Sequence, residues 1–124
     1  QEGYISIDET CYYQSDLDVL QDFIDVNESL NGNRLAMGSQ LWVDGRLISL
    51  DLSESNLSGE IPNSIGNLSA LEQLYLNDNQ LIGDIPHGIG NLIDLERIVI
   101  FSNQLSGKIP QEIINLFNLE YVPE

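Results

Sequence analysis

The sequence predicts an α/β solenoid, a right-handed coil in which each turn adds one short strand to a parallel β-sheet on the concave face. The first observation is a 24-residue period, which starts at Leu47 and recurs at Leu71, Leu95 and Leu119. The second is that glycine, proline, asparagine and further apolar positions keep the same period. The third is an amphipathic segment ahead of the first repeat, which predicts an N-terminal helical cap over the apolar end of the stack.

The first 46 residues are expected to form this cap from a lead-in, a helix and a hairpin. The lead-in, residues 1–13, holds the single cysteine, Cys11, which is either a small residue buried under the cap or a free or intermolecularly bonded thiol. Ser15 to Val26 predicts the helix, because Ser15 and Asp18 form a capping-box pattern ahead of apolar residues at helical spacing. Its apolar face comprises Leu17, Leu20, Phe23, Ile24 and Val26. Asp16 is expected on the opposite, polar face, against the positive end of the helix dipole.

Residues 27–38 are polar and permit two interpretations. Asn27, Ser29, Asn31 and Gly32 occupy positions of a calcium-binding loop, but its first Asp and its final Glu are absent. We therefore prefer a plain turn and predict no metal site. Ser39 to Leu47 predicts a β-hairpin, because Asp44-Gly45 lies between two apolar runs.

Residues 47–124 contain three complete 24-residue repeats and a truncated fourth. Each repeat opens with apolar residues at the first, fourth and sixth positions, which alternation along a strand turns towards a common core. The ninth position is Asn79 or Asn103, with Ser55 in the first repeat. A buried amide there is expected to hydrogen-bond the backbone of adjacent turns, whereas Ser55 can do only part of this.

The second half of each repeat contains Gly-x-Ile-Pro, at residues 59–62, 83–86 and 107–110, followed by Ile-Gly-Asn-Leu or Ile-Ile-Asn-Leu. Together with the Leu-x-x-Leu-x-Leu-x-x-Asn pattern, these segments resemble the plant-type leucine-rich repeat. The resemblance implies a second short strand and a turn of tight helix on the convex side. The helix, Trp42 and Gly45-Arg46-Leu47 likewise resemble the N-terminal cap of plant-type repeat proteins, but the paired cysteines near the Trp are absent. The sequence therefore looks closer to secreted bacterial proteins with the same repeat.

Strand alternation also assigns side chains to the exposed concave face, where polarity changes from acidic and small in the first repeat to apolar in the third. Apolar side chains on a wet face indicate a contact surface, although scattered exposed apolar residues are also ordinary. The candidate contact residues are Asp51, Gln73, Tyr75, Arg97, Val99 and Phe101.

The fourth repeat stops after its first two core positions, which predicts an uncovered apolar edge and an unpaired strand. Three explanations are open: a fragment of a longer array, a tail that folds over the edge, or head-to-tail docking on the cap of an identical molecule. The predicted assembly edge comprises Leu116, Leu119, Tyr121 and Val122. The matching cap surface comprises Cys11, Tyr12, Tyr13, Leu17 and Leu20.

The charge and hydropathy of the chain exclude some classes of binding partner. Twenty acidic and four basic residues give a net charge of −16, which opposes binding to nucleic acid or anionic membranes. No apolar run approaches the roughly 18 residues of a membrane helix, so we predict no membrane insertion. The start at Gln1 indicates either a mature secreted chain or a trimmed one. Together with the resemblance, this predicts an extracellular or cell-surface protein.

Catalytic chemistry has little support in this sequence. It has one cysteine and one histidine, His87, which is expected to be solvated, and it has no cluster with metal-ligand spacing. We predict neither enzymatic activity nor a cofactor. Three glycosylation sequons begin at Asn27, Asn56 and Asn67, and the first and third are expected to be exposed.

The preferred hypothesis is a secreted, non-enzymatic protein that acts through protein–protein contact, by head-to-tail self-assembly into a filament or another extracellular structure. The alternative is a ligand-recognition module that binds a peptide or glycan on the concave face, or a fragment of a receptor ectodomain.

Overall fold

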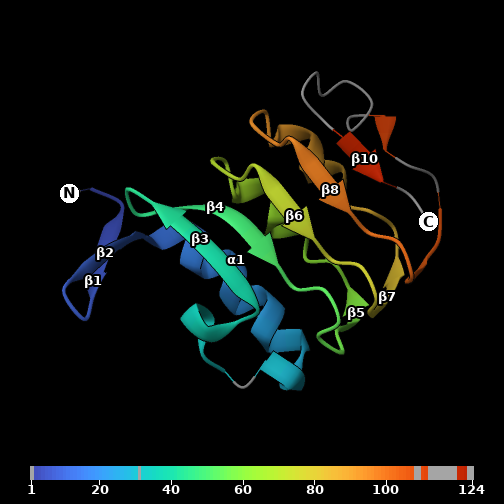
Figure 1. Cartoon of the computed structure of the whole chain (residues 1–124), viewed down its shortest axis with the longest axis horizontal. Coiled ribbons are helices and arrows are strands. Elements are labelled where there is room, and N and C mark those ends of the chain that lie inside the picture. Colours follow the sequence, from blue (N-terminus) through green and yellow to red (C-terminus); the bar gives the residue numbers. More distant parts are fainter. Residues whose placement is uncertain (1, 31, 108–109, 112–119, 123–124) are drawn as a thin grey trace.

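A five-stranded sheet is the main feature of the computed structural model, which describes residues 2–30, 32–107, 110–111 and 120–122 (Figure 1). In spatial order its strands are β10 (Glu120–Val122), β8 (Arg97–Val99), β6 (Gln73–Tyr75), β4 (Arg46–Asp51) and β3 (Ser39–Val43). Strands β4, β6, β8 and β10 are parallel, whereas β3 is antiparallel to β4. Each predicted repeat therefore adds one strand to a parallel sheet.

The register of this sheet follows the 24-residue period across the first three repeats. Leu50 is opposite Leu74, and Leu74 is opposite Ile98, and all three side chains are fully buried. The last pair differs, because Tyr121 is opposite Ile98 and Glu120 is opposite Arg97. The 24-residue period that aligns Leu119 with Leu95 would place Tyr121 opposite Arg97, so this expectation is wrong by one residue.

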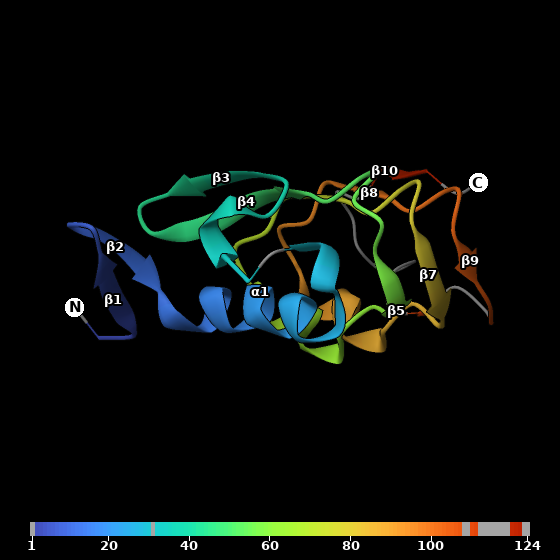
Figure 2. The same cartoon turned by 90° about the horizontal axis from the view of Figure 1, so that it is seen from below.

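A second, three-stranded parallel sheet consists of β5 (Ser58–Glu60), β7 (Gln80–Gly83) and β9 (Gln104–Leu105). Figure 2 shows it at one end of the molecule, beside the layer that contains the helices. The 3-10 helices η3 (Asn63–Asn67) and η4 (His87–Asn91) follow Pro62 and Pro86, whose ring fixes a φ near −60°. The first two repeats thus contain the predicted second strand and turn of tight helix.

The two 3-10 helices stack with their backbones in close approach. A Cβ atom added at Gly66 would lie 2.5 Å from the carbonyl oxygen of Gly88, which is closer than real Cβ atoms come to backbone. A Cβ atom added at Gly88 would meet the carbonyl oxygen of Asn63 at 3.3 Å, which is a milder contact. Glycine at residue 66 therefore allows successive repeats to pack at this spacing.

Helix α1 (Gln14–Val26) begins after Tyr13, and no side chain caps its first turn. The predicted capping box of Ser15 and Asp18 is wrong, because Asp18 instead accepts a hydrogen bond from Gln14 Nε2 at 2.8 Å. Leu17 and Leu20 are fully buried, since this face of α1 packs into the molecule. Their assignment to a docking surface on the cap is therefore also wrong. Val26, expected on the buried face, is 53 % exposed.

The lead-in forms a structure that the sequence did not predict, an antiparallel hairpin of β1 (Tyr4–Ile7) and β2 (Thr10–Tyr13). This hairpin contacts strand β3, since the rings of Tyr12 and Trp42 lie 5.0 Å apart, edge to face. The thiol of Cys11 is free and exposed, so the interpretation of this residue as buried is wrong.

The predicted hairpin is formed by β3 and β4, with Asp44 and Gly45 between them. Both turn residues have positive φ, as the tight turns that connect twisted strands require. The polar segment before it contains two short 3-10 helices, η1 (Glu28–Leu30) and η2 (Arg34–Ala36).

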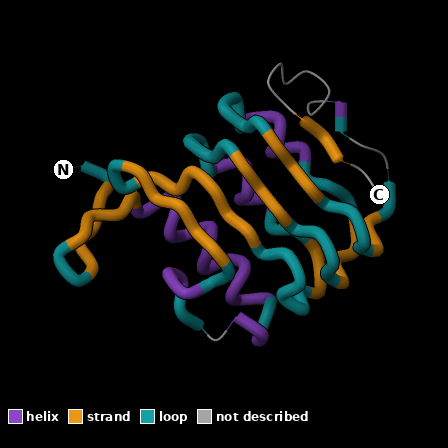
Figure 3. The backbone as a smooth tube through the Cα atoms, in the orientation of Figure 1, coloured by secondary structure: helices purple, strands orange, loops and turns teal. Residues whose placement is uncertain are grey.

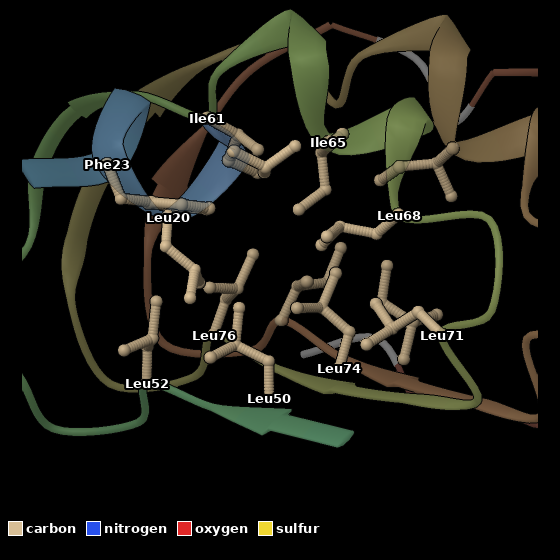
Figure 4. Packing of buried hydrophobic residues seen from close by; sticks show 14 of the residues in the cluster. Leu20, Phe23, Leu50, Leu52, Ile61, Ile65, Leu68, Leu71, Leu74 and Leu76 are labelled. Atoms are coloured by element: carbon tan, nitrogen blue, oxygen red, sulfur yellow. The ribbon is translucent and has the colours of Figure 1, made fainter. Parts of the chain in front are cut away.

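One hydrophobic core runs between the sheet and the helices. It joins residues of α1, such as Phe23, to the inward side chains of all three complete repeats. Figure 4 shows this packing for Leu20, Phe23, Leu50, Leu52, Ile61, Ile65, Leu68, Leu71, Leu74 and Leu76. The helices lie on one side of the five-stranded sheet (Figures 2 and 3). The opposite side, without helices among the described residues, is called the open face below.

Candidate functional site

The open face corresponds to the predicted concave contact surface. Sheet register places two rows of residues across it, Leu41–Ser49–Gln73–Arg97 and Ser39–Asp51–Tyr75–Val99. A third set, which follows the ends of the strands, comprises Ser53, Asn77 and Phe101. Adjacent strands therefore bring the predicted contact residues together, although they lie about one repeat apart in the chain.

The side chains of this face differ in accessibility. Asp51, Gln73, Tyr75, Arg97 and Phe101 are half-buried, so each presents part of its surface to solvent. Val99 is only 6 % exposed, and its assignment as an accessible contact residue is wrong. Strand β10 pairs beside it, so that Val99 lies inside the sheet and not at its edge.

Leu41 belongs to this face and was missed by the sequence reasoning. It is opposite Ser49 in the register, and the residue is 53 % exposed. The signal was present, because the Asp44-Gly45 turn fixes how β3 pairs with β4. The open face therefore has apolar surface at β3 as well as at Tyr75 and Phe101.

Polar groups on the face are held by local hydrogen bonds. Asp51 Oδ1 accepts from the backbone N–H and the hydroxyl of Ser53, at 2.9 and 2.6 Å. Asn77 Nδ2 donates to Asp78 Oδ2 at 2.6 Å. Among the described residues of the three rows, Arg97 is the one cation. The face thus offers aromatic surface, side-chain amides and two opposite charges on a rigid sheet.

The predicted asparagine positions hold the turns that follow the strands. Asn79 Oδ1 accepts from the N–H groups of Ser55 and Leu57, at 2.9 and 3.0 Å, while its Nδ2 donates to the carbonyl of Leu52 at 2.9 Å. Asn103 repeats the arrangement one turn later, with the N–H of Leu81 at 3.0 Å and the carbonyl of Leu76 at 2.8 Å. These amides bridge adjacent repeats and fix the backbone that carries Ser53, Asn77 and Phe101. In the first repeat, the Ser55 hydroxyl bonds the carbonyl of Ser53 at 3.1 Å.

A partly buried ion pair joins α1 to the first repeat, and the sequence did not predict it. Asp16, expected on the polar face of the helix, is fully buried, and its Oδ2 lies 2.9 Å from Arg46 Nε. The same oxygen accepts from the N–H of Leu47 at 3.0 Å. Arg46 Nη2 donates to Ser69 Oγ at 2.8 Å, and the guanidinium lies 4.1 Å from the centre of the Tyr13 ring. The hydrogen bond to Asp16 raises the pKa of Arg46.

The structure places the remaining predicted residues as follows. Tyr12 and Tyr13 are half-buried. Of the assembly edge, Leu116 and Leu119 lie outside the described residues, while Tyr121 and Val122 are in β10. Asn67 is exposed as expected, and Asn56 is exposed too. Asn27 is buried, because its amide bonds the carbonyl of Phe23 and the N–H of Ser58, so its expected exposure is wrong.

Within the described part of the chain, no group of three or more His, Cys, Asp or Glu side chains is placed to hold a metal ion. The helices of that same part are all too short or too polar to cross a membrane.

Comparison with known families identifies the repeats. The model of the Leucine Rich Repeat family matches three segments of the chain, residues 46–68, 70–92 and 94–116. Together these segments cover more than half of the chain. The chain belongs to the leucine-rich repeat family. No curated protein matches the sequence.

Solved structures with the same leucine-rich repeat fold include plant receptor ectodomains. The PEPR1–AtPEP1 complex superposes with a TM-score of 0.76 and 25 % identity, over 89 % of this chain and 18 % of that one. The Arabidopsis receptor kinase HAESA, in complex with the peptide hormone IDA and the co-receptor SERK1, superposes with a TM-score of 0.55 and 37 % identity. This match covers 62 % of the present chain and 14 % of HAESA. The Arabidopsis thaliana receptor kinase GASSHO1/SCHENGEN3, in complex with CASPARIAN STRIP INTEGRITY FACTOR 2, superposes with a TM-score of 0.59 and 25 % identity. This match covers 87 % of the present chain and 17 % of that receptor kinase. The present chain spans less than a fifth of each of these proteins.

Proposed function

We propose that this leucine-rich repeat chain is a non-enzymatic, extracellular or cell-surface recognition module that binds a peptide on its open face. The observation that carries the proposal is the open face itself, where half-buried Tyr75 and Phe101 adjoin polar side chains on adjacent strands. The similar solved structures support it, because HAESA is in complex with a peptide hormone. The architecture that we propose is a right-handed coil with α1 as its N-terminal cap.

The chemistry of the face suits an extended peptide. Tyr75, Phe101 and Leu41 supply apolar surface for side chains of the ligand, and aromatic residues of this kind dominate many binding interfaces. The amides of Gln73 and Asn77 can bond the exposed backbone of a peptide, both as donors and as acceptors. The guanidinium of Arg97 is matched in shape and charge to a carboxylate.

Head-to-tail self-assembly, the first hypothesis from the sequence, is less well supported. Strand β10 of the same chain pairs with β8, so the edge of the third repeat is engaged within the molecule. The similar solved structures that name a bound partner are complexes with other molecules, which favours the recognition hypothesis. The self-assembly hypothesis predicts a molecular mass that rises with protein concentration, and the recognition hypothesis does not.

The experiment is selection of a displayed random-peptide library on the immobilised chain. Enriched peptides should lose affinity by about tenfold or more when Tyr75→Ala or Phe101→Ala removes an aromatic contact. The matched control is Ile93→Ala, an exposed apolar residue outside the three rows, which should leave the affinity unchanged. Circular dichroism checks that each variant is folded.

Three results would contradict the peptide proposal. One is a library that yields no enriched sequence, and another is enriched peptides that bind both aromatic variants as well as the parent chain. The third is binding to a glycan array with the same dependence on Tyr75 and Phe101, which would replace the peptide with a carbohydrate ligand.

A further inference from the structure

A second surface, separate from the open face, has the features of a binding groove. It has a volume of about 520 Å³ and lies between the C-terminal half of α1 and strands β5 and β7. Figure 2 shows this end of α1 near β5, on the side of the five-stranded sheet where the helices lie. The residues that line it include Asp22, Asp25, Val26, Glu60, Pro62 and Ile82.

The groove contains unusually exposed apolar side chains. Val26 is 53 % exposed at the end of α1, and Ile82 is 46 % exposed in β7. The buried side chain of Ile61 and the ring of Pro62 line the groove between them. Apolar surface from three separate elements therefore converges here, and a bound side chain would remove it from water.

Carboxylates surround this apolar surface. Asp25 and Glu60 are exposed, and half-buried Asp22 accepts a hydrogen bond from Ser64 Oγ at 2.6 Å. Asp25 accepts from the neutral amide of Gln21 at 2.9 Å. No Lys, Arg or His is among the residues found to line the groove. Three negative charges therefore act together in one concave surface, which strengthens attraction for a cation.

The distribution of these charges favours an extended occupant over a metal ion. Among the residues that the structure describes, no three carboxylates, histidines or cysteines are placed to share one metal ion. A second copy of this chain would be a poor partner, since each molecule carries a net charge of −16. We propose that the groove binds a segment of a different protein in which lysine or arginine side chains flank an apolar side chain.

In this arrangement the apolar side chain occupies the space between Val26 and Ile82. The flanking cations lie against Asp25 on the side of α1 and against Glu60 on the side of β5. The apolar contact supplies the affinity that exposed ion pairs alone do not provide, because such pairs contribute little individually. The open face would remain free for its own ligand, since no residue of its three rows lines the groove.

The test uses a short, terminally blocked peptide of alternating leucine and lysine as the probe, titrated into the isotopically labelled full chain and followed by NMR. Backbone amides of Val26, Glu60 and Ile82 should shift, and binding should weaken as salt is added. A double variant, Asp25→Asn with Glu60→Gln, should raise the dissociation constant of the peptide about fivefold. A second variant, Val26→Ser, should also weaken binding while leaving the charges intact.

The matched control is the double variant Asp94→Asn with Glu96→Gln, which removes the same charge from exposed residues outside the groove. It should leave the affinity unchanged. Equal weakening in this control would overturn the proposal, because general attraction to an acidic protein would then explain binding. Equal binding of a leucine–glutamate peptide, shifts confined to the open face, or groove shifts that appear with protein concentration alone would overturn it too.

Discussion

Buried polar groups are satisfied differently between the repeats and at their N-terminal side. Between repeats, Asn79 and Asn103 use neutral amides that each bridge one turn to the next. At the N-terminal side, Asn27 also bridges to the first repeat with a neutral amide, but Asp16 adds a full charge, which bonds both Arg46 and the N–H of Leu47. The first solution recurs with the repeat, whereas the second joins residues from α1 and β4.

The difference shows what each contact needs from its surroundings. A repeat packs against another repeat of the same shape, so one neutral side chain at a fixed position serves each turn. Helix α1 meets the first repeat without such symmetry, and its carboxylate needs a cation to offset the cost of burial. Loss of either arrangement leaves buried polar groups without partners, but different groups in each case.

The largest expected effect is that of Asn79→Ala. It leaves N–H groups of Ser55 and Leu57 and the carbonyl of Leu52 without their partner, in a buried position. We expect a loss of about 4 kcal/mol in the free energy of unfolding, measured by urea denaturation. Asn103→Ala should cost about half as much, because Asn103 is half-buried and water can replace part of its bonding. Equal losses for the two variants would contradict this account.

The next effect is that of Asp16→Ala, for which we expect a loss of about 3 kcal/mol because Arg46 and Leu47 lose their acceptor. Asp16→Asn should cost less, since its amide oxygen can still accept from Leu47. A double-mutant cycle with Arg46→Ala should give a coupling energy of about 1–3 kcal/mol. Additive effects of Asp16→Ala and Arg46→Ala in that cycle would show that the pair does not act as a unit.

A smaller effect tests the backbone contact between repeats. Gly66→Ala should lower the free energy of unfolding by about 2 kcal/mol, because its Cβ atom would overlap the carbonyl of Gly88. Gly88→Ala is the matched control and should cost less, since its Cβ atom meets the carbonyl of Asn63 at 3.3 Å. The reverse order in thermal denaturation would mean that the two 3-10 helices do not pack as described.

The smallest effect concerns pH. The bond to Asp16 raises the pKa of Arg46 in the folded state. Arg46 therefore stabilises the fold at every pH below its pKa in the unfolded chain, and this contribution is lost only as pH rises through the folded-state pKa. The stability difference between the parent chain and Arg46→Gln should stay constant from about pH 7 to about pH 10. A fall over that interval would show that another group titrates with the pair.

The repeating parts of this molecule were predictable because their surroundings repeat. The parallel strands, the buried leucines and the Asn79 and Asn103 bridges all follow from one 24-residue pattern. The contacts that it missed are specific to one place. Asp16 has the sequence pattern of a solvated aspartate, and only the tertiary fold brings Arg46, 30 residues away, to its carboxylate.

The candidate site shows the same division. Alternation along the strands placed Tyr75 and Phe101 on the open face, and both are partly exposed there. It also placed Val99 there as an accessible side chain, although Val99 is buried in the structure. Accessibility depends on neighbouring strands, and the one-residue change of register at β10 cannot be derived from a period of 24.

The antiparallel pairing of β3 with β4 has a consequence for how such a protein can change in length. An additional unit of 24 residues between β4 and β8 would meet a parallel strand and an asparagine bridge on each side. A unit inserted between β3 and β4 would separate two strands that only Asp44 and Gly45 connect. Duplication can therefore add repeats between β4 and β8 but not between β3 and β4. The number of repeats can change while the hairpin at their N-terminal side stays the same.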